Sequence, residues 1–194
     1  MSKKTIKQRD MTDCGAACLA SIAAHYKLNL PVARVRQLAG TDQKGTNVLG
    51  MTEGAQKIGL LAKGVRGPFE SLPKVPLPAV AHVVVNGGLH HYVVIYKVAE
   101  NYIQVMDPAE GKLHRKSHAE FKEIWSGILI LMQPDDGFQP GNERASVLAR
   151  FWQLMKPHWR VLLQALFGAV VYTILGLSNF HFRAENRRLC TRRW

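Results

Sequence analysis

The stretch Gln8–Cys18, QRDMTDCGAAC, determines how the rest of this sequence is interpreted. It leads into small apolar residues, and this pattern predicts an alanine-rich helix over Ala16–Tyr26. Cys14 would lie at the start of that helix, where the helix dipole and an adjacent imidazolium both stabilise a thiolate, the nucleophilic form of cysteine. Cys14 is therefore a candidate nucleophile. Cys18, one turn further into the apolar helix, is expected to be a buried core thiol.

Four neighbouring residues fit a nucleophile at this position. Thr12 and Asp13 can cap the helix. Gly15 has no side chain and would let the backbone approach a substrate carbonyl. Gln8, six residues before the cysteine, can donate a side-chain N–H to an oxyanion, together with the backbone N–H of Cys14.

A nucleophilic cysteine needs a base, and the base needs an orienting group. Adjacent histidines open the predicted strand HHYVVIY, residues 90–96, and alternation directs their side chains to opposite faces, so only one can face the site. If residues 99–101 turn the chain into the next strand, His91 and Asp107 come close together. The carboxylate can then hold one nitrogen of the imidazole. His90 is the alternative base.

The order of the predicted elements indicates an α+β fold, in which helices precede an antiparallel sheet. The strands are rich in Val and Ile and are bounded by Gly, Pro and Asn. Helices are predicted at Ala16–Tyr26, Pro31–Ala39, Val48–Ile58 (capped by Thr46 or Asn47) and Ser117–Trp125, and strands at Leu60–Arg66, Ala79–Asn86, His91–Val98, Tyr102–Met106 and Gly127–Met132.

Composition divides the chain into four segments. These are a folded domain over 1–136, a linker over 137–146, an amphipathic and candidate transmembrane helix over 147–180, and a basic tail, expected to be disordered, over 181–194. Residues 161–177 carry no charge, and extended through Phe180 the apolar segment reaches about 20 residues, which is the length that spans a bilayer. A buried core helix is the alternative interpretation.

The formal net charge of +12 is unevenly distributed. Residues 1–136 contain 17 basic and 12 acidic residues, whereas the last 58 contain 9 basic and 2 acidic ones. The folded domain has no basic stripe interleaved with aromatic residues, which argues against nucleic-acid binding. The start, MSKKTIKQRD, has no apolar core and is not a secretory signal, so the first domain is expected in the cytosol.

The sequence predicts neither a metal site nor a nucleotide site. His114 and His118 are four residues apart but fall across a predicted strand-to-helix junction, and no CxxC or HExxH pattern occurs. The phosphate-binding pattern GxxxxGK[ST] is also missing. GTDQKGTN, residues 40–47, has the two glycines without the lysine and is interpreted as a helix-capping turn.

These motifs resemble those of the bacteriocin-processing cysteine peptidases, cysteine-peptidase family 39. QRDMTDCGAACLASIAAHY is similar to the family's opening motif, and HYVVIY and DPAEG are similar to its histidine and aspartate motifs. The resemblance covers about residues 5–133. It implies a papain-like fold with Cys14 as nucleophile, His91 as base, Asp107 as orienting residue and Gln8 in the oxyanion hole.

The resemblance also implies a function. Such domains remove leader peptides after a double glycine from bacteriocin or pheromone precursors, as the N-terminal part of an ATP-driven peptide exporter. A double glycine at the cut implies a narrow groove that rejects a Cβ atom. The leader is expected to bind as an amphipathic helix on an apolar surface. The alternative is a docking domain that binds the leader without cleaving it, but the presence of all four motif residues favours cleavage.

The exporter context implies a membrane partner through residues 161–180, a location at the cytoplasmic face of the bacterial membrane, and a dimeric assembly. It also implies that ATP binds only to the exporter's nucleotide-binding domain, which this sequence does not contain. The arginine-rich segment after Ser178 does not resemble the family. A truncated or frameshifted exporter gene is the expected explanation.

Overall fold

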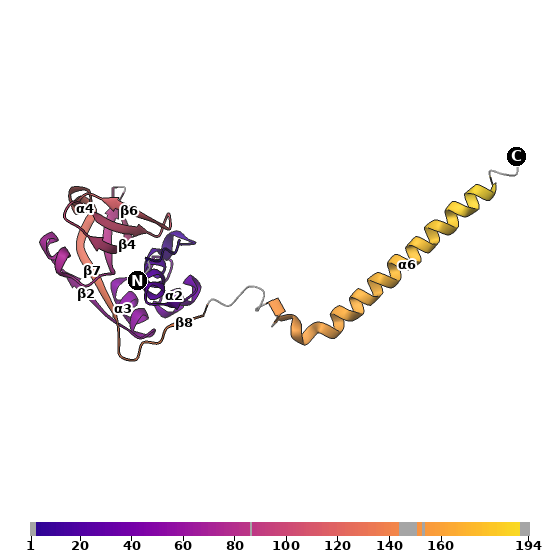
Figure 1. Cartoon of the computed structure of the whole chain (residues 1–194), viewed down its shortest axis with the longest axis horizontal. Coiled ribbons are helices and arrows are strands. Elements are labelled where there is room, and N and C mark those ends of the chain that lie inside the picture. Colours follow the sequence, from indigo (N-terminus) through magenta and orange to yellow (C-terminus); the bar gives the residue numbers. More distant parts are fainter. Residues whose placement is uncertain (1–2, 86, 144–150, 153, 191–194) are drawn as a thin grey trace. The chain divides into compact units, whose positions relative to one another are not determined.

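The structure is a computed structural model that describes residues 3–85, 87–143, 151–152 and 154–190. The chain forms two compact units, residues 1–144 and 145–194. The first unit contains several helices and a sheet, and the second contains one long helix (Figure 1).

Helix α1 (Cys14–His25) is the central helix of the first unit. Every residue from Cys14 to Ala24 is buried, because strand β4 (Leu89–Val98), helix α2 (Val32–Leu38) and helix α3 (Val48–Gln56) all pack against this helix. Small side chains permit such close packing on more than one side, which accounts for the alanine-rich sequence. The predicted helix is confirmed, and it begins two residues earlier than predicted.

The two short helices that follow are also confirmed. Helix α2 ends before Gly40, whose φ of +60° suits glycine. Helix α3 is capped by Asn47, whose Oδ1 accepts a hydrogen bond from the Gly50 N–H at 2.7 Å. The predicted capping turn over residues 40–47 is therefore confirmed.

The sheet has six antiparallel strands in the order β2-β7-β3-β4-β5-β6. The predicted α+β fold and the predicted strands are confirmed. Besides β4, the strands of this sheet are β2 (Leu60–Arg66), β3 (Ala79–Val85), β5 (Ile103–Asp107), β6 (Lys112–Lys116) and β7 (Trp125–Pro134). Strand β6, KLHRK, was not predicted because its sequence lacks apolar alternation. It lies at a sheet edge, where basic side chains discourage pairing with another chain.

Both faces of the sheet are covered. On one face Val80, Val94 and Ile130 pack in the same cluster as residues of α1. On the other face Val93 and Ile95 pack with Phe121 of helix α4 (His118–Ile124) and with Leu72 of the 3₁₀ segment η2 (Phe69–Lys74). Burial on both faces explains why the strand β4 has a continuous apolar sequence. The prediction that Phe121 packs the last helix onto the sheet is confirmed.

The first unit extends beyond the predicted boundary at residue 136. Strand β8 (Gly141–Asn142) pairs in parallel with strand β1 (Leu28–Asn29). The Phe138 ring lies 6.3 Å from the ring of Tyr26, centroid to centroid, and packs against the core. The predicted linker therefore begins too early. Its Gly- and Pro-containing sequence forms a short packed segment before the boundary near residue 144.

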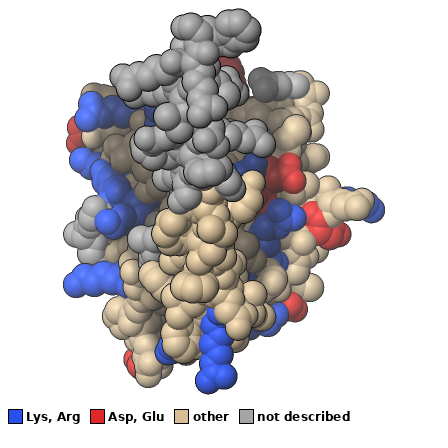
Figure 2. Space-filling model, turned by 90° about the vertical axis from the view of Figure 1, so that its right-hand side faces the viewer, with Lys and Arg blue, Asp and Glu red and all other residues tan. Residues whose placement is uncertain are grey.

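The second unit contains η3 (Lys156–His158) and helix α6 (Trp159–Cys190). Lys156–Gly176 is long and apolar enough to cross a membrane by length and composition, with a mean hydropathy of 1.5, and none of this window is buried. No charged residue occurs over Val161–Gly176, which is drawn tan in Figure 2.

Helix α6 continues to Cys190, so the prediction of a disordered tail is wrong for residues 181–190. This segment, HFRAENRRLC, contains neither glycine nor proline, and its Arg, Ala, Glu and Leu residues have high helix propensity. Residues 147–150 of the predicted amphipathic segment and the last four residues of the tail lie outside the described residues.

Candidate active site

Cys14 is the first residue of α1 and is 7% exposed. A single 3₁₀ turn, η1 (Met11–Asp13), leads the chain into the helix. Asp10 caps that turn, since its Oδ1 accepts a hydrogen bond from the Met11 N–H at 2.7 Å. The structure therefore places the candidate nucleophile at a helix N-terminus, as the sequence predicts.

The predicted capping role of Asp13 is wrong. Its side chain accepts no hydrogen bond from the first turn of α1. Instead, the Asp13 carboxylate is 1% exposed, accepts a hydrogen bond from the Asp10 N–H at 3.2 Å, and lies 2.8 Å from Arg36 Nη1. Sequence reasoning missed this ion pair, because an aspartate just before a helix is the usual signature of a cap.

The structure explains the glycine at position 15 differently from the prediction, in which Gly15 made room for a substrate carbonyl. A Cβ atom at this position would lie 2.8 Å from both the Thr46 Cβ and the Met51 Cε. The glycine therefore lets the loop before α3 pack directly against the first turn of α1. That space is occupied by the protein itself, so it is not available to a substrate carbonyl.

His91 and Asp107 lie on neighbouring antiparallel strands, β4 and β5, as predicted. The predicted turn forms, with the Ala99 N–H donating to the Tyr102 carbonyl at 2.9 Å. His91 Nε2 lies 2.9 Å from Asp107 Oδ1, and the Ala109 N–H donates to the same oxygen at 2.8 Å. The carboxylate thus fixes the imidazole through Nε2, which leaves Nδ1 as the ring nitrogen that can exchange a proton with a thiol.

Burial lowers the pKa of His91, but hydrogen bonding and charge from Asp107 and Cys14 outweigh burial and raise this pKa from 6.5 to about 9. For Asp107, burial raises the pKa, whereas the hydrogen bonds from His91 and Ala109 lower it, and the net direction is downward. An imidazolium beside a carboxylate is therefore the stable state of the pair at neutral pH.

Gln8 lies beside this pair. Its backbone N–H donates to the Pro108 carbonyl at 2.8 Å, which ties the N-terminal segment to the turn that follows Asp107. Its side-chain Oε1 is buried and has no hydrogen-bond partner among the described residues. A buried amide with unused hydrogen-bonding capacity is the exception in folded proteins, and such groups occur at functional sites.

His90, the alternative base, belongs to a different cluster. Its Nδ1 lies 3.2 Å from His82 Nε2, and the two rings are stacked with centroids 5.2 Å apart. His82 Nδ1 in turn lies 2.7 Å from Ser126 Oγ. Asp107 is hydrogen-bonded to His91 instead, so the geometry favours His91 as the base.

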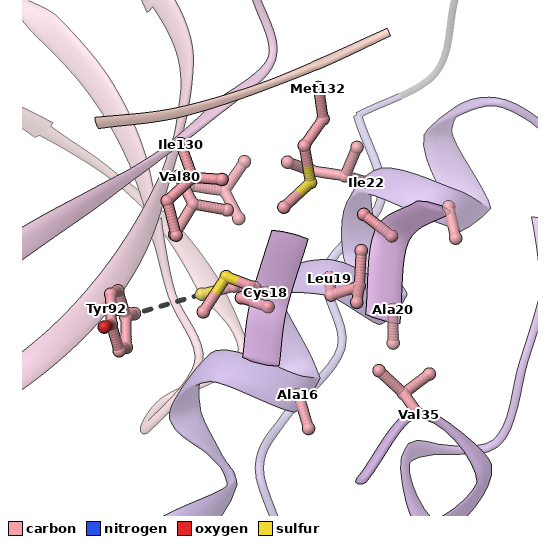
Figure 3. Packing of buried hydrophobic residues seen from close by; sticks show 14 of the residues in the cluster. Ala16, Cys18, Leu19, Ala20, Ile22, Val35, Val80, Tyr92, Ile130 and Met132 are labelled. Carbon is pink, nitrogen blue, oxygen red and sulfur yellow. Dashed lines mark hydrogen bonds between the residues drawn. The ribbon is translucent and has the colours of Figure 1, made fainter. Parts of the chain in front are cut away.

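Cys18 is a core thiol, as predicted. It is fully buried, and its Sγ–H donates to the Tyr92 carbonyl at 3.4 Å (Figure 3). Val80 and Ile130 of the sheet line the same region in Figure 3. Burial raises the pKa of Cys18 well above its ordinary value, and the nearby Cys14 and Asp107 raise it further. Cys18 is therefore a poor nucleophile.

His114 and His118, the two histidines weighed as metal ligands in the sequence, contact two different protein groups. His114 Nε2 lies 3.2 Å from Glu110 Oε2, and His118 Nε2 donates to the Ala99 carbonyl at 2.8 Å. Within the described part of the chain, no three His, Cys, Asp or Glu side chains are grouped to hold a metal ion. His114 instead lines an open groove of about 620 Å³ that also includes His91 and Asp107.

A cysteine at a helix N-terminus with a histidine–carboxylate pair on neighbouring strands is the arrangement of a cysteine peptidase. The model of the peptidase C39 family matches residues 2–137. The chain therefore belongs to the peptidase C39 family, a family of cysteine peptidases. This confirms the family, the fold and the enzyme class that the motifs predicted.

Characterised relatives are similar over most of this chain. The lactococcin-G-processing and transport ATP-binding protein LagD of Lactococcus lactis is 36% identical over 184 residues, which cover 93% of this chain and 25% of LagD. The pediocin PA-1 transport/processing protein PedD of Pediococcus acidilactici is 32% identical and is likewise covered to 25%. The chain thus spans about a quarter of the length of these relatives.

Solved structures give the same result for the first unit. The peptidase domain of Streptococcus ComA, a bifunctional ABC transporter, has a TM-score of 0.65 and 33% identity, covering 69% of this chain and 100% of that domain. A double-glycine-motif protease from an AMS/PCAT transporter, solved with its leader peptide, has a TM-score of 0.62 and 34% identity over 67% of this chain and 90% of its own.

Proposed function

We propose that this chain is an endopeptidase that removes double-glycine leader peptides from bacteriocin or related peptide precursors. Cys14 is the nucleophile, His91 the base, Asp107 its orienting group, and Gln8 the side-chain donor of the oxyanion hole. The observation that carries the proposal is the position of His91, which is hydrogen-bonded to Asp107 and interacts with Cys14 at the N-terminus of α1.

The geometry supports a two-step acyl transfer. The Cys14 thiolate attacks the carbonyl carbon of the second glycine, and the electron pair of the C=O bond moves to its oxygen. As the C–N bond breaks, the His91 imidazolium gives its Nδ1 proton to the leaving amine. The neutral imidazole then takes a proton from water, whose hydroxide cleaves the thioester. The leader carboxylate and the thiolate are released.

The oxyanion needs two donors close to the sulfur. The Cys14 backbone N–H is one in this proposal, because Cys14 is the first residue of α1 and lies at the positive end of the helix dipole. The Nε2–H of the Gln8 side-chain amide is the second in this proposal, because the Gln8 backbone N–H is anchored to the Pro108 carbonyl, next to Asp107.

The relatives support the choice of substrate. LagD is named for processing lactococcin G, and the solved double-glycine-motif protease is bound to a leader peptide. An endopeptidase that accepts two glycines needs a cleft too narrow for a Cβ atom, so Gly→Ala at either substrate position should abolish cleavage.

The same relatives support an exporter context. In this proposal the helix over Lys156–Gly176 crosses the bacterial membrane, and the peptidase unit lies at the cytoplasmic face as part of a dimeric exporter. ATP would act on the exporter's nucleotide-binding domain and not on the peptidase unit.

The test is cleavage of a synthetic double-glycine leader by the full chain in mild detergent, with products identified by mass spectrometry. We expect a cut after the second glycine in the wild type and in His90→Ala, and none in Cys14→Ala. If neither wild type nor Cys14→Ala cleaves but both bind the leader, the chain is a docking domain and the endopeptidase proposal is wrong.

A further inference from the structure

A buried ion pair lies directly next to the candidate nucleophile. The Asp13 carboxylate, one residue before Cys14, is 1% exposed, and Arg36 Nη1 of helix α2 lies 2.8 Å from its Oδ1. Arg36 reaches this carboxylate from a partly exposed position, with 35% of its side chain accessible. Within the described residues, the other polar contact of the carboxylate is the hydrogen bond that its Oδ2 accepts from Asp10.

The position of this carboxylate creates an electrostatic problem. Consecutive Cα atoms lie about 3.8 Å apart, so the Asp13 carboxylate and the Cys14 sulfur lie within roughly 10 Å of each other, whichever way the two side chains point. A carboxylate next to a thiolate disfavours the thiolate. The same carboxylate is nearly inaccessible to water and cannot be screened by solvent. A nearby positive charge offsets it, and Arg36 supplies such a charge.

The pair also fixes the geometry of the chain at this point. Asp13 ends η1 and precedes α1, and it is bonded to Asp10 at the other end of that turn. The Arg36 guanidinium connects this junction to α2, which packs against α1. The N-terminus of α1 is thus held from two directions, and Cys14 is the next residue.

We propose that Arg36 is a positioning residue for the nucleophile. It pins the start of α1 through Asp13 and neutralises the carboxylate that would otherwise oppose a thiolate at Cys14. This inference rests on the proposed function, in which Cys14 attacks the substrate. Among the described residues, His91, Tyr92 and Cys18 interact electrostatically with Cys14, and a substitution at Arg36 alters none of these three side chains.

The experiment measures alkylation of Cys14 by iodoacetamide at pH 6.5, followed by peptide mapping, together with kcat/KM for the leader peptide. In Arg36→Met the unpaired carboxylate should slow alkylation about tenfold and reduce kcat/KM by a similar factor. Asp13→Asn in the Arg36→Met background removes that charge and should restore most of both rates. Arg34→Met, a charge removed from the exposed side of the same helix, is the matched control and should change neither.

Thermal unfolding of each variant separates lost reactivity from lost structure. Should Arg36→Met fail to fold, Arg36→Lys, which keeps the charge without the planar guanidinium, replaces it and should show a smaller reduction in the same direction. Equal alkylation rates in the wild type and the folded Arg36 variant would overturn the proposal, as would a double variant that stays as slow as the single one. Alkylation does not require leader cleavage, so a wild type that fails to cleave overturns the proposed function and leaves this test intact.

Discussion

Replacing Asp107 by asparagine tests whether the charge of this carboxylate raises the pKa of His91. The carboxylate is the strongest of the groups that raise the pKa of His91. That pKa rises from 6.5 to about 9, which at about 1.4 kcal/mol per unit corresponds to about 3 kcal/mol of stabilisation of the imidazolium. Burial opposes this rise, so the interactions with Asp107 and Cys14 together exceed the net value.

The asparagine keeps the shape and a hydrogen-bond acceptor but removes the charge. If Asp107 supplies about half of the net rise, the pKa of His91 falls by at least about one unit. At pH 8 the protonated fraction of His91 then drops from about 0.9 to about 0.5 or less. The alkaline limb of the kcat/KM profile should shift to lower pH by the same number of pH units.

The assay is kcat/KM for a fluorogenic leader peptide between pH 6 and 10 at constant ionic strength. Glu110→Gln is the matched control, because Glu110 lies in the same turn but pairs with His114 and is not among the groups that raise the pKa of His91. Its profile should coincide with that of the wild type. An Asp107→Asn profile whose alkaline limb also coincides with the wild type would refute the reasoning.

Three further predictions concern the surroundings of the site. Because the pKa of His91 is raised and that of Asp107 is lowered, the pair's contribution to stability is fully present between about pH 4 and pH 6.5 and is lost as the pH rises through about 9. The difference in denaturant midpoint between wild type and His91→Gln should therefore shrink between pH 6.5 and 9, and a constant difference would contradict the reasoning. Gly15→Ala should cost about 1–3 kcal/mol in urea unfolding, because the new Cβ meets Thr46 and Met51 at 2.8 Å; an unchanged midpoint would show that the loop yields freely. Cys18→Ala should keep leader cleavage and lose about 1 kcal/mol of stability through lost packing, so an inactive but folded variant would mean that Cys18 takes part in the chemistry.

Much of the fold follows from local sequence patterns. The capping turn before α3, the alanine-rich helix and the apolar strands each depend on residues close together in the chain. The contact between His91 and Asp107 was predictable for the same reason, because a short turn joins the two strands. Cys14 is more than 70 residues away from His91, so no local pattern brings them together. The need of a nucleophilic cysteine for a base suggested that pairing, and the resemblance to a known family supported it.

The features that the sequence did not predict depend on long-range contacts or have a sequence pattern typical of another structure. Arg36 and Asp13 lie on different elements, and the aspartate has the sequence signature of a cap. Strand β6 is too basic to show a strand pattern, and it forms because β5 offers an unpaired edge. Strand β8 has a linker-like sequence, and its parallel partner β1 lies more than 110 residues earlier in the chain. The space beside Gly15 is filled by a loop that no local pattern places there.

The most direct test of the central claim is to trap the acyl-transfer nucleophile. A leader peptide ending in a glycine chloromethyl ketone is incubated with the full chain, and the alkylated residue is identified by peptide mapping. The account predicts a single adduct on Cys14, strongly reduced in His91→Ala, with Cys18 and Cys190 unmodified. An adduct on another residue, or equal labelling of Cys14 with and without His91, would contradict it.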